Sequence, residues 1–212
     1  MDITVVNINT NNHKWSFEMP NWANQFPLVM GDTYRHGGVS KKPCESLNLA
    51  THIGDSLQDV LDNRSIVVDH LGVSPDRITC GNQVHGLNAV RITEDLIGAG
   101  AMSSDTAIPD CDAVYTDIPN APLFLFTADC VPVGIYDPVH HVGATVHAGW
   151  RGAIGHLPVI TIEAMQRDFG TRFEDCYVYL GPSIGPKSFE VNQELADTFT
   201  DEWKKITDAN CY

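Results

Sequence analysis

The sequence of 212 residues is poor in basic side chains and has no long apolar segment. Only 13 Lys and Arg accompany 27 Asp and Glu, which gives a formal net charge of −14 at pH 7. Nucleic acids and anionic membrane surfaces bind clusters of Lys and Arg, so we expect neither as a partner. No run of about 18 or more apolar residues occurs, which predicts no membrane-spanning helix. Residues 1–15 lack a basic segment followed by an apolar stretch, and we expect no secretory signal there.

The chain also lacks the cysteine and histidine spacings of familiar metal proteins. Its six cysteines are scattered singly without a CxxC pair, and no HxH pair occurs. A multicopper oxidase needs many more histidines in such pairs, so this class is disfavoured. Without an export signal, the cysteines are expected to be free thiols of a reducing cytoplasm, most of them buried as small apolar residues.

Length and patterning predict one domain in which strands and helices mix. With 43% hydrophobic residues the chain can bury a sizeable core. Helices are expected over residues 55–71, ending at Gly72, over 153–169, ending at Gly170, and over 192–205. Pro158 predicts a break or a late start in the second of them. Strands are expected at 3–7, 15–19, 89–92, 112–116, 123–126, 131–136, 142–146 and 177–180, the first two as a hairpin. Because strands and helices do not alternate regularly, we expect a layered α/β domain with mixed sheets.

Two short segments carry the clearest chemical signal: TADC at 127–130 and HAGWRG at 147–152. Each follows an apolar run, and the two runs are predicted to form neighbouring strands. Cys130 and His147 would then lie together, as a metal site or a nucleophile–base pair requires. His85, in NQVHG, follows another short apolar run. Two His and one Cys form a three-ligand set suited to zinc, with the fourth position left for water or substrate.

Simpler interpretations stay open for each of these residues. A free cysteine is often a buried apolar residue, and the two histidines would then be a core and a loop histidine. Asp129 beside Cys130 favours function, because it could orient a ligand or accept a proton. Arg151 lies between two glycines at an expected helix start, which suits an anion such as phosphate. An ordinary surface position is an equal interpretation of Arg151.

The glycine-rich loop RHGGVS at 35–40 is a second candidate for binding an anion. Its glycines permit unusual backbone angles and the close approach of a ligand, and a simple turn is the alternative. The residues that we expect to bind substrate or phosphate are Arg35, Ser40, Gln83 and Arg151.

Seven segments resemble, in order, the motifs of one family: RHGGVS, SLNLATHIGD at 46–55, NQVHG at 82–86, DAVYTD at 112–117, TADCVPV at 127–133, HAGWRG and LGPSIGP at 180–186. They are similar to those of the YfiH-like family, whose members are also labelled laccase-domain, polyphenol oxidase or purine nucleoside phosphorylase proteins. The family's metal ligands are the His of QVHG, the Cys of ADC and the His of HAGWRG. By this resemblance they fall on His85, Cys130 and His147.

The resemblance implies both a fold and an activity. The fold is a four-layer αββα sandwich, two mixed sheets packed between helices, related to the catalytic domain of the cytotoxic necrotizing factor toxins. The activity is zinc-dependent phosphorolysis of adenosine, inosine and methylthioadenosine, together with deamination of adenosine. The HxE and PCxxC signature of known zinc deaminases is absent, so deamination would use a different scaffold. Purine nucleoside and phosphate are the expected partners.

Three alternatives remain at this point. Copper-dependent oxidation of phenols is an older assignment in the family, and a His₂Cys set resembles that of blue-copper sites. The toxins are Cys–His deamidases, which keeps a metal-free hydrolase with Cys130 as nucleophile, His147 as base and Asp129 as orienting acid. A non-enzymatic binding protein is the third alternative.

The sequence departs from the family pattern in two places. PKS at 186–188 follows GPSIG, where the family often has cysteines, and this weakens a copper site that needs extra thiols. The sequence stops at NCY, 210–212, where the family continues into a further strand. We therefore expect residues 1–212 to form a single YfiH-like domain that lacks its C-terminal segment, and the natural protein to be longer.

Overall fold

The structure, a computed structural model, describes residues 3–9 and 13–199. The strands of this part form a three-stranded sheet in the order β1–β2–β3, a five-stranded sheet in the order β10–β8–β9–β6–β5, and a two-stranded sheet of β4 and β7. The elements are β1 (Ile3–Asn9), β2 (Lys14–Pro20), β3 (Asp32–Thr33), α1 (Leu57–Leu71), β4 (Thr79–Cys80), β5 (Ala89–Arg91), β6 (Ala113–Thr116), β7 (Leu123–Phe124), β8 (Val131–Asp137), β9 (Val142–Ala148), α2 (Trp150–Ile154), α3 (Leu157–Phe169), β10 (Tyr177–Leu180) and α4 (Gln193–Thr198). The β4–β7 and β5–β6 pairs are parallel and the others antiparallel, so the predicted mixed sheets are confirmed.

The five-stranded sheet is apolar on the face that α3 covers. Along β9, Val142, Ala144 and Val146 are buried and join the core that includes Leu157 and Met165 of α3. Side chains alternate between the faces of a strand, so Thr145 and His147 point away from α3. The face opposite α3 is therefore the one that can carry polar chemistry.

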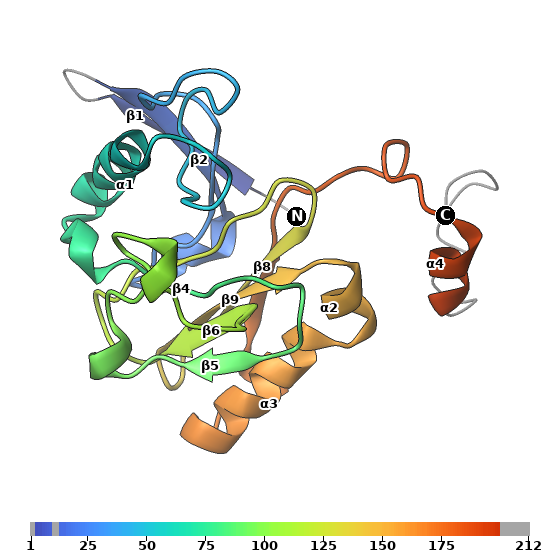
Figure 1. The fold of residues 1–212 in the computed structure, drawn as a ribbon. Coiled ribbons are helices and arrows are strands. Elements are labelled where there is room, and N and C mark those ends of the chain that lie inside the picture. The colour runs from blue at the N-terminus through green and yellow to red at the C-terminus, as the bar shows by residue number, and fades with distance from the viewer. Residues whose placement is uncertain (1–2, 10–12, 200–212) are drawn as a thin grey trace.

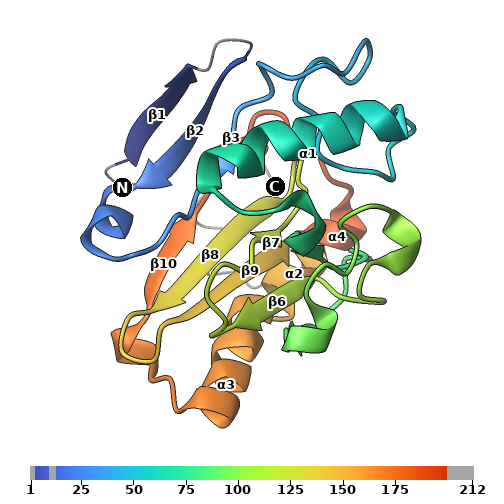
Figure 2. The same ribbon diagram turned by 90° about the vertical axis from the view of Figure 1, so that its left-hand side faces the viewer.

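Helix α1 and the two smaller sheets lie on that opposite side. Trp15 and Phe17 of β2 pack with Val67 of α1, and Val68 of α1 packs with Ile78, next to β4. Figure 1 and Figure 2 show α1 and α3 on opposite sides of the sheets, so the chain stacks as helix, small sheets, large sheet and helix. This agrees with the layered α/β fold expected from the sequence. Helix α4 lies apart from these layers (Figure 1).

The helix ends follow local signals in the sequence. Ser56 caps α1 by accepting a hydrogen bond from the Asp59 backbone N–H, and Gly72 ends the helix with φ 66°. The expected helix at 153–169 is two helices, because His156, at φ 57°, interrupts the chain between α2 and α3. Pro158 stands in the first turn of α3, where no backbone N–H is needed, so the late start is confirmed.

Three expectations need correction. The apolar run at 123–126 is a strand only over Leu123–Phe124, and it pairs with β4 rather than beside β9. The last helix ends at Thr198 with Phe199 extended, and residues 200–205 of that prediction lie outside the described residues. Of the five described cysteines, all free, only Cys80 and Cys111 are buried. Cys211 lies outside the described residues.

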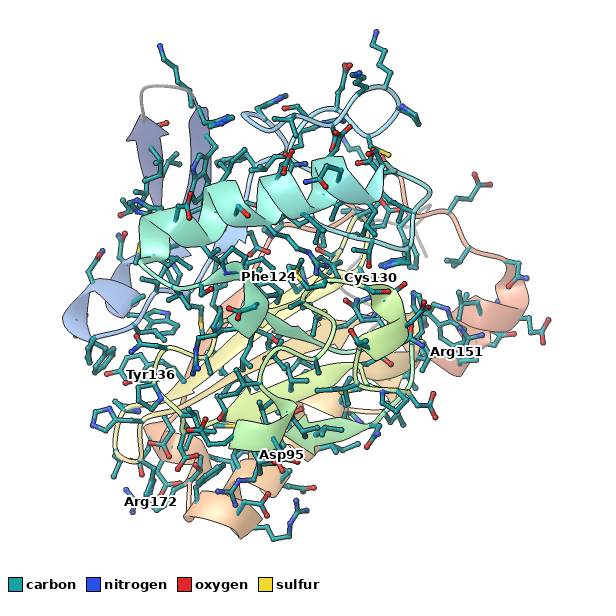
Figure 3. All side chains as sticks on the ribbon, turned by 60° about the vertical axis from the view of Figure 1, so that its left-hand side comes forward. Asp95, Phe124, Cys130, Tyr136, Arg151 and Arg172 are labelled. Atoms are coloured by element: carbon teal, nitrogen blue, oxygen red, sulfur yellow. The ribbon has the colours of Figure 1, made fainter. Side chains whose placement is uncertain are left out.

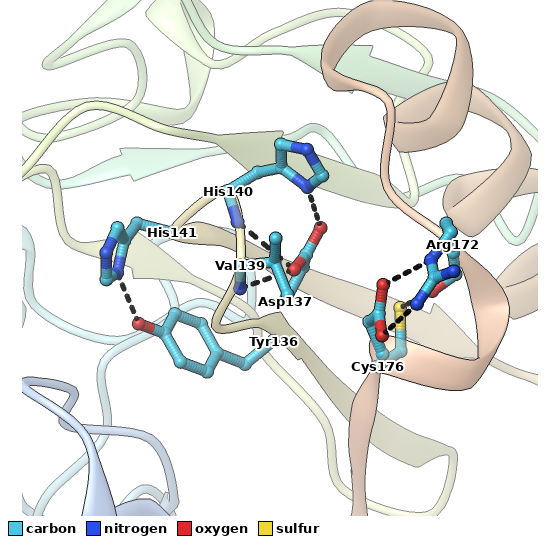
Figure 4. A network of polar contacts seen from close by, with 8 residues as sticks. Tyr136, Asp137, Val139, His140, His141, Arg172 and Cys176 are labelled. Carbon is cyan, nitrogen blue, oxygen red and sulfur yellow. Dashed lines mark hydrogen bonds and ion pairs between the residues drawn. The ribbon is translucent and has the colours of Figure 1, made fainter.

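The turn between β8 and β9 is fixed by a buried carboxyl group. Asp137 Oδ1 accepts hydrogen bonds from the backbone N–H of Val139 (2.8 Å) and of His140 (3.2 Å), and Oδ2 lies 2.8 Å from His140 Nδ1 (Figure 4). Burial alone would raise the pKa of Asp137, but these hydrogen bonds outweigh it and the pKa is lowered. The closed end of the hairpin is therefore stabilised by contacts that do not involve its open end.

No helix in the described part of the chain is long and apolar enough to cross a bilayer.

Candidate functional site

Strand pairing places Cys130 and His147 at the same end of the large sheet. In the antiparallel β8–β9 pair, Pro132 stands opposite His147 and Val131 opposite Ala148. Cys130 comes one residue before β8 and shares with Pro132 and His147 the face turned away from α3. Figure 3 shows Cys130 at the opposite end of β8 from Tyr136. The sequence predicted that Cys130 and His147 lie close together. The strand that leads from Cys130 and pairs with β9 is β8, however, and not the run at 123–126.

His85 reaches the same place on a loop between β4 and β5. Gln83 fixes this loop: its side chain accepts from the Phe126 N–H at 2.9 Å and donates to the Phe126 carbonyl at 2.8 Å. His85 itself has φ 60°, a left-handed conformation that is uncommon for a residue with a side chain. His141 and His156 adopt the same region, so the angle is a feature of the His85 loop and not by itself a sign of function.

The ligand atoms of His85, Cys130 and His147 all lie within 4.8 Å of one another. The two imidazole rings have centroids 4.7 Å apart and stand at 69° to each other. Zn–N and Zn–S bonds of about 2.0–2.3 Å place tetrahedral ligands about 3.5 Å apart, so small side-chain movements would complete such a site. The donor set and its spacing therefore fit a zinc ion.

Gly149 makes room for this cluster. A Cβ atom at position 149 would lie 2.9 Å from His85 Cδ2 and 3.2 Å from Cys130 Sγ. Any larger residue would push against two of the three side chains. The first glycine of HAGWRG thus packs against the candidate ligands, and the start of α2 lies beside them.

Asp112 supports the cluster, and the sequence interpretation missed it. Its Oδ1 lies 2.7 Å from His147 Nδ1 and accepts the His85 N–H at 2.9 Å, while Oδ2 accepts the N–H groups of Val84 (3.1 Å) and Gly86 (2.8 Å). Burial would raise the pKa of Asp112, but the bonds from His147 and the three N–H groups lower it overall. The carboxylate therefore holds both histidines, one by its ring and one by its backbone. The only signal in the sequence for this role of Asp112 is its place at the start of a strand, in DAVYTD.

Asp129 does not orient His147, contrary to the expectation for the hydrolase alternative. Its side chain is exposed, and its carbonyl accepts the Ile184 N–H at 2.9 Å. Burial raises the pKa of the Cys130 thiol, and the carboxylates of Asp129 and Asp112 raise it further. The thiol is thus protonated at neutral pH unless a cation displaces the proton.

The residues expected to bind substrate or phosphate have different surroundings. Arg35 donates from Nε and Nη2 to the Glu45 carbonyl, at 3.2 and 2.8 Å. Ser40 is buried and accepts a hydrogen bond from Asn63 of α1 at 2.8 Å. Arg35 and Ser40 thus stabilise the loop in which they lie. Gln83 stabilises the loop that carries His85 in the same way.

Arg151 is exposed on α2, two residues after Gly149. Its guanidinium carbon lies 4.2 Å from the centre of the Trp150 ring, an arrangement that leaves its N–H groups available. Within the described part of the chain no hydrogen bond or ion pair engages the Arg151 guanidinium, whereas that of Arg35 is bound to the Glu45 carbonyl.

Known proteins are similar to this chain over most of its length. A family model described as multi-copper polyphenol oxidoreductase laccase matches residues 29–211. The chain is 37% identical over 170 residues to the purine nucleoside phosphorylase YlmD of Geobacillus stearothermophilus, covering 80% of this chain and 62% of that protein. It is 33% identical over 180 residues to YlmD of Bacillus subtilis, covering 83% of this chain and 65% of that protein.

A solved structure shows the same fold. The crystal structure of the hypothetical protein YfiH from Bacillus licheniformis superposes with a TM-score of 0.77 at 31% identity, covering 89% of this chain and 65% of that one. The chain spans less than two thirds of the length of these relatives. The resemblance drawn from the seven motifs is confirmed. The chain belongs to the multi-copper polyphenol oxidoreductase laccase family, together with proteins named YfiH and YlmD.

Proposed function

We propose that this chain carries the catalytic centre of a zinc-dependent purine nucleoside phosphorylase acting on adenosine, inosine and methylthioadenosine, with adenosine deaminase activity. The observation that carries the proposal is the convergence of the ligand atoms of His85, Cys130 and His147 within 4.8 Å. Asp112 supports this cluster through its contact with the His147 ring. The names of the relatives support the choice of nucleoside and phosphate as substrates.

The three converging residues would hold the zinc. When bound, zinc supplies a Lewis acid with one coordination position open to water or substrate. Asp112 prepares the protein ligands: because its carboxylate accepts a hydrogen bond from His147 Nδ1, the lone pair of His147 is on Nε2. Gly149 and Gln83 keep the rings and the loop in place.

The reaction requires an anion site next to the nucleoside. In phosphorolysis a phosphate oxygen bonds to C1′ of the ribose as the C1′–N9 bond breaks, and the proton of the phosphate ends on the released purine. Arg151, whose side chain is exposed on α2 two residues after Gly149, is the residue that we assign to phosphate. Arg35 would assist only through the part of its guanidinium that Glu45 does not engage.

The proposal is tested by incubating the zinc-loaded protein with inosine, with and without phosphate, and separating the products. Hypoxanthine and ribose 1-phosphate should form only with phosphate, and adenosine should in addition give inosine and ammonia. Release of no base from any of the three nucleosides, in protein shown to contain zinc, would contradict the phosphorylase proposal.

We predict that Arg151→Ala mainly weakens phosphate binding, by about 1.5–3 kcal/mol, the value of a hydrogen bond to a charged group. The KM for phosphate should therefore rise while the KM for inosine changes little. Arg167, which is bound to Asp168 on α3, offers a matched control, Arg167→Ala. A phosphate dependence unchanged in Arg151→Ala would show that the assignment is wrong.

A metal-free Cys–His hydrolase is the second candidate, because Asp112, His147 and Cys130 form a chain of acid, imidazole and thiol. Asp112 takes the orienting place that was expected for Asp129. In the described residues no hydrogen bond joins the Cys130 thiol to either imidazole, which favours the metal site.

Chelation separates the two candidates. We predict that stripping the metal abolishes nucleoside turnover, that zinc restores it, and that protein purified without added metal contains zinc and not copper, since the ligands suit zinc and no HxH pair exists. Activity indifferent to chelation would favour the hydrolase. Stoichiometric copper with a thiolate-to-copper absorption band would contradict the zinc assignment.

A further inference from the structure

A cavity of about 410 Å³ opens beside the TADC segment. Its polar lining comes from three parts of the chain: Asp32 and Thr33 of β3, Thr127 and Asp129 before β8, and Ser183 after β10. The volume lies within the roughly 300–1,000 Å³ of small-molecule sites. Two acidic residues and three hydroxyl-bearing residues therefore line one space large enough for a small organic molecule.

The cavity adjoins the candidate metal centre along the start of β8. The Gly181 N–H donates to the Pro132 carbonyl and the Ile184 N–H to the Asp129 carbonyl, both at 2.9 Å, so the segment after β10 runs alongside the TADC segment. Because β8 lies between β10 and β9, Cys130 has this cavity wall on one side and His147 on the other. A molecule in the cavity would contact Thr127 and Asp129, in the segment that directly precedes the candidate ligand Cys130.

The position of Asp32 at the cavity wall is electrostatically unfavourable. It stands directly opposite Glu18 in the β2–β3 pair, where like charges destabilise a sheet. The Tyr179 hydroxyl donates its proton to Glu18 Oε1 at 3.0 Å, and Tyr34 donates to Glu18 Oε2 at 3.0 Å. Burial raises the pKa of Asp32 to about 6, with Tyr179 lowering it and Glu18 adding to the rise.

The position of Asp32 depends on a glycine. A Cβ atom on Gly181 would collide with Asp32 Oδ2 and would lie 2.7 Å from Pro132 Cγ. The chain thus leaves space for this carboxyl group at the cavity wall, although the group repels Glu18. Hydrogen-bond donors brought by a ligand would stabilise the charged carboxylate.

We propose that this cavity binds the ribose of the nucleoside, with Asp32 and Asp129 accepting hydrogen bonds from the sugar hydroxyls. The identity of the sugar rests on the proposed function. Among the described residues, the cavity lining includes no Lys, Arg or His, so two carboxylates would repel phosphate and favour a neutral, hydroxyl-rich group. Thr33, Thr127 and Ser183 add hydroxyl partners of the kind that sugars use. Phosphate would then approach from the Arg151 side.

The test compares inosine with 2′-deoxyinosine and 3′-deoxyinosine, by calorimetric binding without phosphate and by kcat/KM with phosphate. A site that accepts a hydroxyl proton should reject at least one deoxy analogue by about tenfold or more in the wild type, the range for a hydrogen bond to a charged group. Asp32→Asn should reduce that discrimination to about threefold or less. Gly181→Ala, which displaces the carboxyl group without removing it, should do the same.

Glu18→Gln is the matched control, because Glu18 neighbours Asp32 without lining the cavity, and it should keep the wild-type discrimination. Circular dichroism confirms that each variant folds. Discrimination unchanged in both Asp32→Asn and Gly181→Ala, in a protein that still cleaves inosine, overturns the ribose site and leaves the proposed function standing. A zinc-loaded wild type that neither binds nor cleaves inosine overturns both.

Discussion

Under the proposed function, replacing Cys130 with serine should abolish zinc binding and reduce nucleoside phosphorolysis by about a thousandfold or more, which is about 4 kcal/mol in the barrier. A serine hydroxyl stays protonated at neutral pH and is a far poorer zinc ligand than a thiolate, so two histidines would remain as ligands. The fold should survive, because the side chains are nearly the same size and Cys130 is only half-buried. Zinc content, circular dichroism and turnover of inosine measure the three effects separately.

Cys176→Ser is the matched control, since Cys176 is another half-buried free thiol, just before β10, near the closed end of the β8–β9 hairpin (Figure 4). It should retain both zinc and activity. If Cys130→Ser turned over nucleosides at the wild-type rate, the zinc site and the cysteine hydrolase would both be refuted, because each requires this thiol.

Asp112→Asn should weaken both the fold and the site. The carboxylate accepts four hydrogen bonds, whereas an asparagine presents one oxygen and one NH₂ group. Whichever way the amide turns, its NH₂ faces N–H donors, and buried donors lose their acceptor. At about 1–3 kcal/mol for each of the two donors, we expect a loss of about 2–6 kcal/mol in the free energy of unfolding. Denaturant unfolding at pH 7 measures it, and zinc affinity should fall at least about tenfold.

The stabilisation that Asp112 provides should depend on pH, and the direction of its pKa shift gives the sign of that dependence. Because the folded-state pKa of Asp112 is lowered, its stabilisation is present above the unfolded-state pKa and is lost as the pH falls through the folded value. The difference between wild type and variant should therefore shrink only in strong acid. Asp110→Asn is the control, since Asp110 is exposed and asparagine tolerates its φ of 53°. Equal unfolding energies for Asp112→Asn and Asp110→Asn would contradict the role of Asp112.

The parts of the fold that could be predicted from the sequence are those set by neighbouring residues. The helix at 57–71 has its Ser56 cap and Gly72 stop within one continuous pattern, and the β8–β9 hairpin has its two strands and turn within residues 131–148. Cys130, just before β8, and His147, near the end of β9, both lie at the open end of that hairpin, so a local prediction brought them together. His85 was proposed because it follows a short apolar run, completes a His₂Cys set and matches the family motif, since its separation of 45 residues from Cys130 says nothing about proximity.

What could not be predicted depends on contacts between distant segments. Asp112 is 35 residues from His147, and only the β6–β9 register brings them together. The two-residue strands β4 and β7 have no periodicity of their own and exist because they pair with each other. The cavity wall combines Asp32, Asp129 and Ser183, and no pattern in the sequence relates these three positions.

The carboxylate of Asp112 also gives the His85 loop an unusual property in solution. Amide protons of surface loops ordinarily exchange quickly with solvent deuterium, since water is their partner. Here three consecutive amides, those of Val84, His85 and Gly86, donate to one buried acid and should exchange slowly. The amides of Val139 and His140, bound to Asp137 at the far end of the hairpin, provide an internal reference that does not involve the metal ligands. The ratio of the two exchange rates would report the integrity of the histidine loop in the unmodified protein, without a substrate or an attached probe.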